Sequence, residues 1–191
     1  MIKPNESALL LIDIQKGLDD WAYYGGNRNN TDAEVNASRI LNWYRVRKLP
    51  VFHVQHSSTN PNSPLHPSKP GFEIKDEVRP NAKEPVITKH VNSAFIGTDL
   101  EYQLRQKNIK TVVIVGLTTN HCISSTVRMA ANFGFRTFLI SDATAAFDGK
   151  GPNGKRYHAE TMHQTSLASL HDEFAQVLTT NEIIGDASVW G

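Results

Sequence analysis

The chain has 191 residues, of which 39% are hydrophobic, and its 20 Lys and Arg residues against 19 Asp and Glu residues give a formal net charge of +1. Such a chain is typical of a globular domain with a sizeable core, and its balanced, scattered charges exclude the pattern of nucleic-acid or anionic-membrane binding, so we expect a small-molecule partner. Cys122 is the only cysteine, which excludes an intrachain disulfide and a cysteine-based zinc site, and the first residues, MIKPNES, lack a secretory signal, so we expect a cytoplasmic protein.

Five short apolar runs predict the strands of a sheet. Each run is bounded by turn residues and none has a polar face, as expected of parallel strands buried on both sides. Longer amphipathic stretches separate them, which is the alternation of an α/β protein. The runs are residues 8–12, 51–54, 85–88, 111–115 and 137–140.

Four stretches predict helices. Residues 32–48 carry apolar side chains at a mixed spacing of three to five, and residues 159–177 place apolar side chains on one face. The segment 98–101, TDLE, fits a capping box, so a helix should begin there. Another helix should span residues 122–133 and end at Gly134, a residue type that suits the position after a helix.

Two further segments predict loops. Residues 57–81 hold five of the nine prolines, and Leu65, Phe72 and Ile74 within the segment favour an ordered loop that lies over the domain. Residues 148–157 contain three glycines and a proline, which predicts a flexible loop before the last helix. We expect neither segment to be a domain boundary.

Polar residues follow three of the predicted strands. Asp13 follows the first run, Lys89 follows the third, and Cys122 follows the fourth across a short turn. Because ligands of open α/β sheets bind beyond the carboxyl ends of the strands, we expect an acid, a base and a thiol to converge there. Each residue also has a plain alternative: an inert buried cysteine, a carboxylate that caps a turn, and a lysine that reaches solvent.

Together these side chains suit a nucleophilic thiol. Cys122 opens a predicted helix, whose dipole favours the thiolate, and a nearby cation such as Lys89 lowers a thiol pKa further. Asp13 can take the thiol proton during attack and return it to the leaving group. Backbone N–H groups of the turn before Cys122 can stabilise an oxyanion, so the pattern predicts acyl transfer to water through a thioester.

Four motifs lie at or near these strand ends: DIQ at 13–15, Lys89 followed by NSAF at 92–95, GLTTNHC at 116–122 and SDAT at 141–144. In their order and spacing they resemble the isochorismatase-like cysteine hydrolases over nearly the whole chain. The resemblance implies a three-layer α/β/α fold with Rossmann-like topology around a six-stranded, mainly parallel sheet. It also implies a single hydrolase domain over residues 1–191 and a homo-oligomer, either a dimer or a tetramer.

The resemblance further implies specific roles for residues of this chain. Asp13, Lys89 and Cys122 would form a catalytic triad. The peptide bond between Leu117 and Thr118 would be cis, and the backbone N–H groups of Thr118 and Cys122 would donate to the oxyanion.

The match also separates branches of the family. Isochorismatases proper lack the cysteine, so Cys122 favours hydrolysis of a C–N bond in a small amide, carbamoyl or ureido compound. The nicotinamidase branch carries an Asp-x-His metal signature after the second strand, where this chain reads VQHSS at 54–58. We therefore expect no bound zinc and no other cofactor.

Residues near the predicted strand ends are candidates for the substrate pocket. Aromatic residues after the Asp13 strand can wall such a pocket, although a packed surface loop or a subunit contact is nearly as good an interpretation. The resemblance places the NSAF segment near the active site. The candidate substrate-binding residues are Gln15, Trp21, Tyr23, His56, Asn92, Phe95 and His121.

Two other functions compete with the cysteine hydrolase. A non-catalytic thiol sensor would use Cys122 for a redox response, but it would not need Asp13 as a proton shuttle. A metal hydrolase would use His53 or His56, but alternation along a strand places these two side chains on opposite faces, which is a poor chelate. The sequence favours the cysteine hydrolase.

Overall fold

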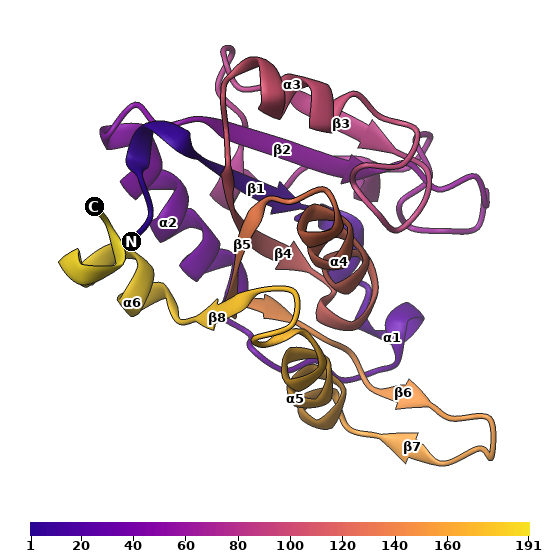
Figure 1. Ribbon diagram of the computed structural model, residues 1–191. Coiled ribbons are helices and arrows are strands. Elements are labelled where there is room, and N and C mark those ends of the chain that lie inside the picture. The colour runs from indigo at the N-terminus through magenta and orange to yellow at the C-terminus, as the bar shows by residue number, and fades with distance from the viewer.

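In a computed structural model, which describes residues 1–191, six strands form one sheet in the order β3-β2-β1-β4-β5-β8 (Figure 1). All neighbouring strands pair in parallel, which confirms the α/β architecture. The strands of this sheet are β1 Ser7–Ile12, β2 Val51–His56, β3 Val86–Lys89, β4 Thr111–Leu117, β5 Arg136–Ala145 and β8 Gln176–Leu178.

Helices cover both faces of the sheet, as the three-layer prediction requires. Successive side chains of β1 point to opposite faces, so Leu10 packs with α4 residues such as Val127, while Leu9 packs with α2 residues such as Ile40. Helices α3, α4 and α5 cover the first face, and α2 and α6 cover the second. The helices are α1 Trp21–Tyr24, α2 Ala33–Val46, α3 Leu100–Gln106, α4 Ser124–Asn132, α5 Ala159–Leu170 and α6 Thr180–Gly185.

The strand order places a topological switch point between β1 and β4. From β1 the chain adds β2 and β3 on one side, then crosses over to β4 on the other side of β1. Loops that leave neighbouring strands in opposite directions open a crevice at the carboxyl ends of these strands. Asp13 follows β1 and the turn that holds Cys122 follows β4, so both residues border this crevice.

Three predicted elements differ from the prediction in their bounds or in their burial. Helix α5 stops at Leu170, because His171 is extended and Asp172 is left-handed (φ 64°), and the predicted final residues of the helix form β8 instead. The predicted capping box does not form: Thr98 donates to the carbonyl of Ala94, and α3 begins at Leu100. Strand β3 lies at the edge of the sheet, so alternate side chains of this strand are exposed.

The two predicted loops are both structured. The segment 57–81 is ordered, with the short 3₁₀ helices Pro70–Phe72 and Asp76–Val78, and Leu65 within it is buried. The segment 148–157 is not an irregular loop but an antiparallel hairpin of β6 Gly149–Lys150 and β7 Arg156–Tyr157. Across the whole structure, no helix combines the length and the hydropathy that crossing a bilayer would require.

Candidate active site

Three chain segments bring Asp13, Lys89 and Cys122 together at the carboxyl edge of the sheet. Asp13 directly follows β1 in a left-handed conformation (φ 51°), which aspartate tolerates better than most residues, and its backbone N–H donates to the carbonyl of Val54 over 2.8 Å. Lys89 is the last residue of β3. Cys122 lies in a π-helical turn, Thr119–Ile123, between β4 and α4.

The ammonium of Lys89 connects the other two groups. Its Nζ atom lies 2.7 Å from Oδ2 of Asp13 and 3.3 Å from Sγ of Cys122. The Lys89 and Asp13 side chains are only 0% and 2% exposed. The second carboxylate oxygen of Asp13, Oδ1, is buried and has no hydrogen-bond partner. One oxygen of the carboxylate is thus held by Lys89, and the other is free to accept a proton.

The surroundings of Cys122 favour the protonated thiol over the thiolate. Burial raises its pKa to about 12, and the negative charge of Asp13 acts in the same direction, while Lys89 opposes both. Cys122 does lie at a helix start, because the π-helical turn continues directly into α4, but the expected lowering of its pKa does not follow, since burial and Asp13 outweigh Lys89. A neighbouring base must therefore remove the proton during attack.

The turn before Cys122 has the backbone that the resemblance implies. The peptide bond between Leu117 and Thr118 is cis. The Thr118 hydroxyl and Nδ1 of His121 are 3.2 Å apart, and burial lowers the pKa of His121, which favours the neutral ring. The backbone N–H of Thr118 donates to no protein acceptor, so it remains available to a ligand.

A buried histidine supports the same turn from α5. Nδ1 of His163 is 2.8 Å from the hydroxyl of Thr119, and its Nε2 is 3.3 Å from the amide nitrogen of Asn30. Asn30 also donates to the carbonyls of Ser141 and Thr144, in the SDAT motif. Burial lowers the pKa of His163, as for a neutral core histidine. These residues hold the turn in place from outside the cavity.

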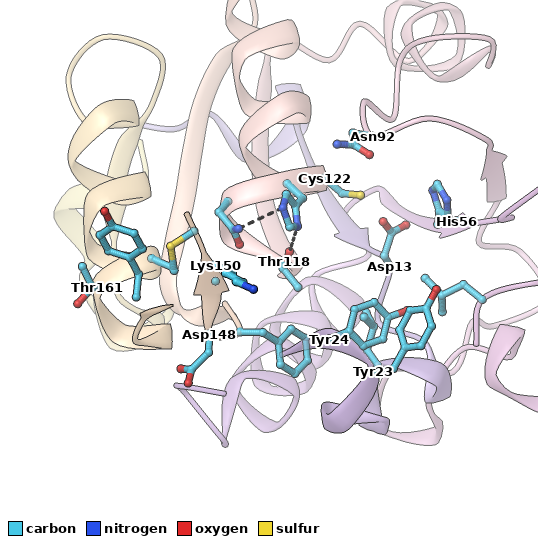
Figure 2. A pocket seen from close by; sticks show the side chains of 18 of the residues that line it. Asp13, Tyr23, Tyr24, His56, Asn92, Thr118, Cys122, Asp148, Lys150 and Thr161 are labelled. Atoms are coloured by element: carbon cyan, nitrogen blue, oxygen red, sulfur yellow. Dashed lines mark hydrogen bonds between the residues drawn. The ribbon is translucent and has the colours of Figure 1, made fainter. Parts of the chain in front are cut away.

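A cavity of about 900 Å³ opens over Cys122 (Figure 2). Figure 2 shows Cys122 and Asp13 at one end of the cavity and Asp148 and Thr161 at the other. Several residues that the sequence did not single out as pocket residues line it, among them residues of the β6–β7 hairpin and α5. Examples are Leu18, Phe147, Lys150, Tyr157, Thr161 and Met162.

Four of the seven candidate substrate-binding residues line this cavity, namely Tyr23, His56, Asn92 and His121. The other three, Gln15, Trp21 and Phe95, are not among its lining residues.

Those three residues have packing or positioning roles instead. The amide of Gln15 is fully buried: it donates to the carbonyls of His56 and Phe72 and accepts from the His56 N–H, which ties the end of β2 to the adjacent loop. Phe95 packs against the rings of Phe133 and Phe135 in the core. Trp21 packs against a small apolar cluster beneath α1. Sequence position alone could not tell these inward side chains from cavity-facing ones.

The two histidines of β2 occupy different surroundings. Nε2 of His53 is 2.9 Å from a carboxylate oxygen of Glu84, which Arg45 also binds. One atom each of Asp13, His56 and Cys122 lie within 4.8 Å of one another, a spacing that a metal ion could bridge. However, the Lys89 ammonium already lies within hydrogen-bond distance of all three groups, so this position holds a side-chain cation.

Comparison with known proteins places these features in context. A family profile described as isochorismatase domain matches residues 7–182. The chain is 51% identical over 181 residues to YrdC of Bacillus subtilis, described as an uncharacterized isochorismatase family protein, covering 95% of this chain and 96% of YrdC.

Solved structures give the same result. The crystal structure of a protein of the isochorismatase family from Chromobacterium violaceum is similar with a TM-score of 0.91 and 38% identity, covering 99% of this chain and 100% of that one. N-carbamoylsarcosine amidase from Thermoplasma acidophilum is similar with a TM-score of 0.73 and 26% identity, covering 94% of this chain and 99% of that one.

Proposed function

The chain belongs to the isochorismatase family, and from this premise we propose that it is a cysteine hydrolase that cleaves a C–N bond of a small amide, carbamoyl or ureido compound. The family includes hydrolases that act on such bonds, as the name of the similar amidase states. The observation that carries the proposal is the carboxylate of Asp13, with one oxygen bound to Lys89 and the other buried and unpartnered close to the thiol of Cys122.

In the proposed first step, Sγ of Cys122 attacks the carbonyl carbon of the substrate while its proton passes to the carboxylate of Asp13. General-base transfer suits a thiol whose pKa is raised by burial, because no thiolate needs to exist before the substrate arrives. Lys89 stabilises the negative charge that develops on sulfur.

The carbonyl oxygen becomes an oxyanion, which the backbone N–H groups of Thr118 and Cys122 stabilise in the proposed mechanism. The C–N bond then breaks as protonated Asp13 returns the proton to the leaving nitrogen, which departs as an amine or ammonia. A thioester remains on Cys122. Water attacks this thioester with Asp13 again acting as the base, and the acid product and the free thiol are released.

Tyr23, Asn92 and His121 are the proposed substrate contacts. All three line the cavity, and each offers a neutral polar group beside its aromatic and aliphatic wall. The cavity volume of about 900 Å³ accommodates a small molecule well. One chain supplies all three residues of the proposed triad, so the proposed reaction needs no residue from a second chain, and we propose a homo-oligomer as the working state of the enzyme. The proposed location is the cytoplasm, where a single thiol stays reduced.

The thiol-sensor alternative is less well supported. Redox-sensing cysteines are accessible and have low pKa values. Burial raises the pKa of Cys122, and an acid beside the thiol has a use in proton transfer but not in sensing.

The test measures ammonia and amine release from a panel of small amides, carbamoyl compounds and ureido compounds. Cys122→Ala and Asp13→Asn should each abolish release, whereas Asp172→Asn, an exposed and left-handed position, should match wild type. Intact-protein mass spectrometry of wild type should detect the acyl adduct. Release that persists in Cys122→Ala at the wild-type rate would rule out the proposed nucleophile.

A further inference from the structure

The ammonium of Lys89 has three acceptors, and only two of them belong to the triad. The third is Nδ1 of His56, at 3.2 Å from Nζ. An ammonium group carries three protons and no acceptor, so Asp13, Cys122 and His56 together satisfy it completely. Lys89 is 0% exposed, so these three groups, and not solvent, are the acceptors of its protons in the structure. A buried charged donor that loses a partner pays the full cost of desolvation.

The contact fixes the chemical state of the His56 ring. Since Nζ can only donate, Nδ1 must accept, which requires a neutral ring with its proton on Nε2. The groups around the ring agree with this state. Burial lowers the pKa of His56, and the charge of Lys89 lowers it further, with a small contribution from His90; Asp13 and the backbone of Val91 act in the opposite direction.

The end of β2 also holds the ring in place. Gln15 binds both the N–H and the carbonyl of His56 through its side-chain amide. His56 and Lys89 are register partners across the parallel pair of β2 and β3, so their side chains leave the sheet at the same level. The backbone around the contact is therefore fixed from two sides.

We propose that His56 is a positioning residue: as a neutral Nε2–H ring it accepts the third proton of Lys89 and thereby holds the ammonium against Asp13 and Cys122. The proposal rests on the proposed function only in that Cys122 is the reacting group. A merely cavity-lining His56 would contact the substrate and leave Lys89 unaffected.

The first test observes the ring directly. Nitrogen-15 NMR of the histidine rings in the wild-type protein, with His56 assigned from the signal lost in His56→Asn, should report the Nε2–H tautomer at pH 7. In Lys89→Met the pKa of His56 should rise by about 1 unit or more, because a neighbouring positive charge has been removed. An Nδ1–H tautomer, or a pKa that is unchanged in Lys89→Met, would overturn the proposal.

The second test uses the rate at which iodoacetamide alkylates Cys122, the only cysteine, at a fixed pH of about 8.5, near the ordinary thiol pKa. His56→Leu removes the acceptor and should slow alkylation about tenfold, the value of one hydrogen bond to a charged group. His56→Asn places an amide oxygen where Nδ1 stood and should stay within about threefold of wild type. His90→Asn, whose side-chain amide can keep the hydrogen bond that Nδ1 of His90 makes to the carbonyl of Ser57, is the matched control.

The outcomes separate the two proposals. Equal alkylation rates for His56→Leu and His56→Asn contradict the positioning role, even if amides are hydrolysed. The expected NMR and alkylation pattern supports it even if every amide in the panel fails, a result that would count against the proposed reaction alone. Should His56→Leu not fold, the NMR measurement on wild type and Lys89→Met still decides.

Discussion

Lys89 and Asp13, 76 residues apart in the sequence, form an ion pair in which Nζ lies 2.7 Å from Oδ2 and neither side chain is more than 2% exposed. Removing two charges from water is costly, and the loss of one partner leaves the other charge buried without compensation. The loss of either partner should therefore reduce the stability of the fold, apart from its effect on the proposed reaction.

Replacing Lys89 with methionine should lower the free energy of unfolding by about 3 kcal/mol at pH 7, because the Asp13 carboxylate stays buried and loses its cation. Adding Asp13→Asn should recover part of this loss, since the amide carries no charge. Urea denaturation of wild type, Lys89→Met and the double variant measures the free energy of unfolding of each. Lys83→Met, at an exposed lysine, serves as the control, and a double variant no more stable than Lys89→Met would contradict the argument.

Alkylation of Cys122 should report a protonated resting thiol. Because burial raises the pKa of the Cys122 thiol to about 12, the thiolate fraction grows tenfold for each unit by which the pH rises toward that value. The rate with iodoacetamide should therefore climb steadily from about pH 6 to about pH 10 without a plateau. In urea the same thiol should level off near its ordinary pKa. A plateau below about pH 8 in the folded protein would mean that Lys89 outweighs burial and Asp13.

The strands were predictable because a buried parallel strand is apolar on both faces, and five of the six strands of the sheet stand out as apolar runs. Strand β8 escaped prediction because Gln176–Leu178 is short and continues an apolar pattern that also suits a helix. The hairpin of β6 and β7 escaped because its glycines are equally typical of an irregular loop.

The positions of the proposed catalytic groups were more predictable than the residues of the cavity wall. Asp13, Lys89 and Cys122 lie at or just beyond the ends of strands, so topology alone brings them to one edge of the sheet. Which residues line the cavity depends on the direction in which each side chain points after the strand ends. Tyr23 lines the cavity, while nearby Trp21 packs into an apolar cluster. Local sequence contains no signal for that choice.

A buried charge network anchors the segment 57–81 to the rest of the domain. Nζ of Lys75, within this segment, donates to Glu34 over 2.7 Å, and Arg28 binds both oxygens of the same carboxylate. Burial would raise the pKa of Glu34, but Arg28 and Lys75 outweigh it and lower the pKa. The carboxylate thus contributes stability above its ordinary pKa of 4.5, and this contribution is lost as the pH falls through the lowered value.

Lys75→Met should therefore loosen this segment, which supplies Ser63 and Leu65 to the cavity. We expect a loss of about 2 to 3 kcal/mol in unfolding free energy and faster proteolysis within 57–81. The ion pair of Lys16 and Glu73 also joins the segment 57–81 to the rest of the chain but is exposed, so Lys16→Met should cost less than about 1 kcal/mol. Equal effects of the two substitutions would show that burial does not decide the contribution.

Gly116 sets how closely β4 approaches β1 beside the proposed active site. Its φ is 125°, and a Cβ atom there would lie 2.0 Å from the carbonyl oxygen of Ile12, the residue before Asp13. Both the conformation and the contact exclude a side chain, and the contact is with backbone, which cannot rotate away. Gly116→Ala must therefore push apart the two strands whose ends hold Asp13 and the Cys122 turn.

We expect Gly116→Ala to lower the free energy of unfolding by about 3 kcal/mol and to abolish hydrolysis in whatever fraction remains folded. Gly185→Ala is the matched control, since a Cβ atom at Gly185 meets nothing within 4 Å and its φ is not positive. Thermal denaturation and the ammonia assay measure the two effects separately. A Gly116→Ala protein that is as active per folded molecule as wild type would mean that the site tolerates a shift of β4 against β1, and the close approach of these strands would then serve stability alone.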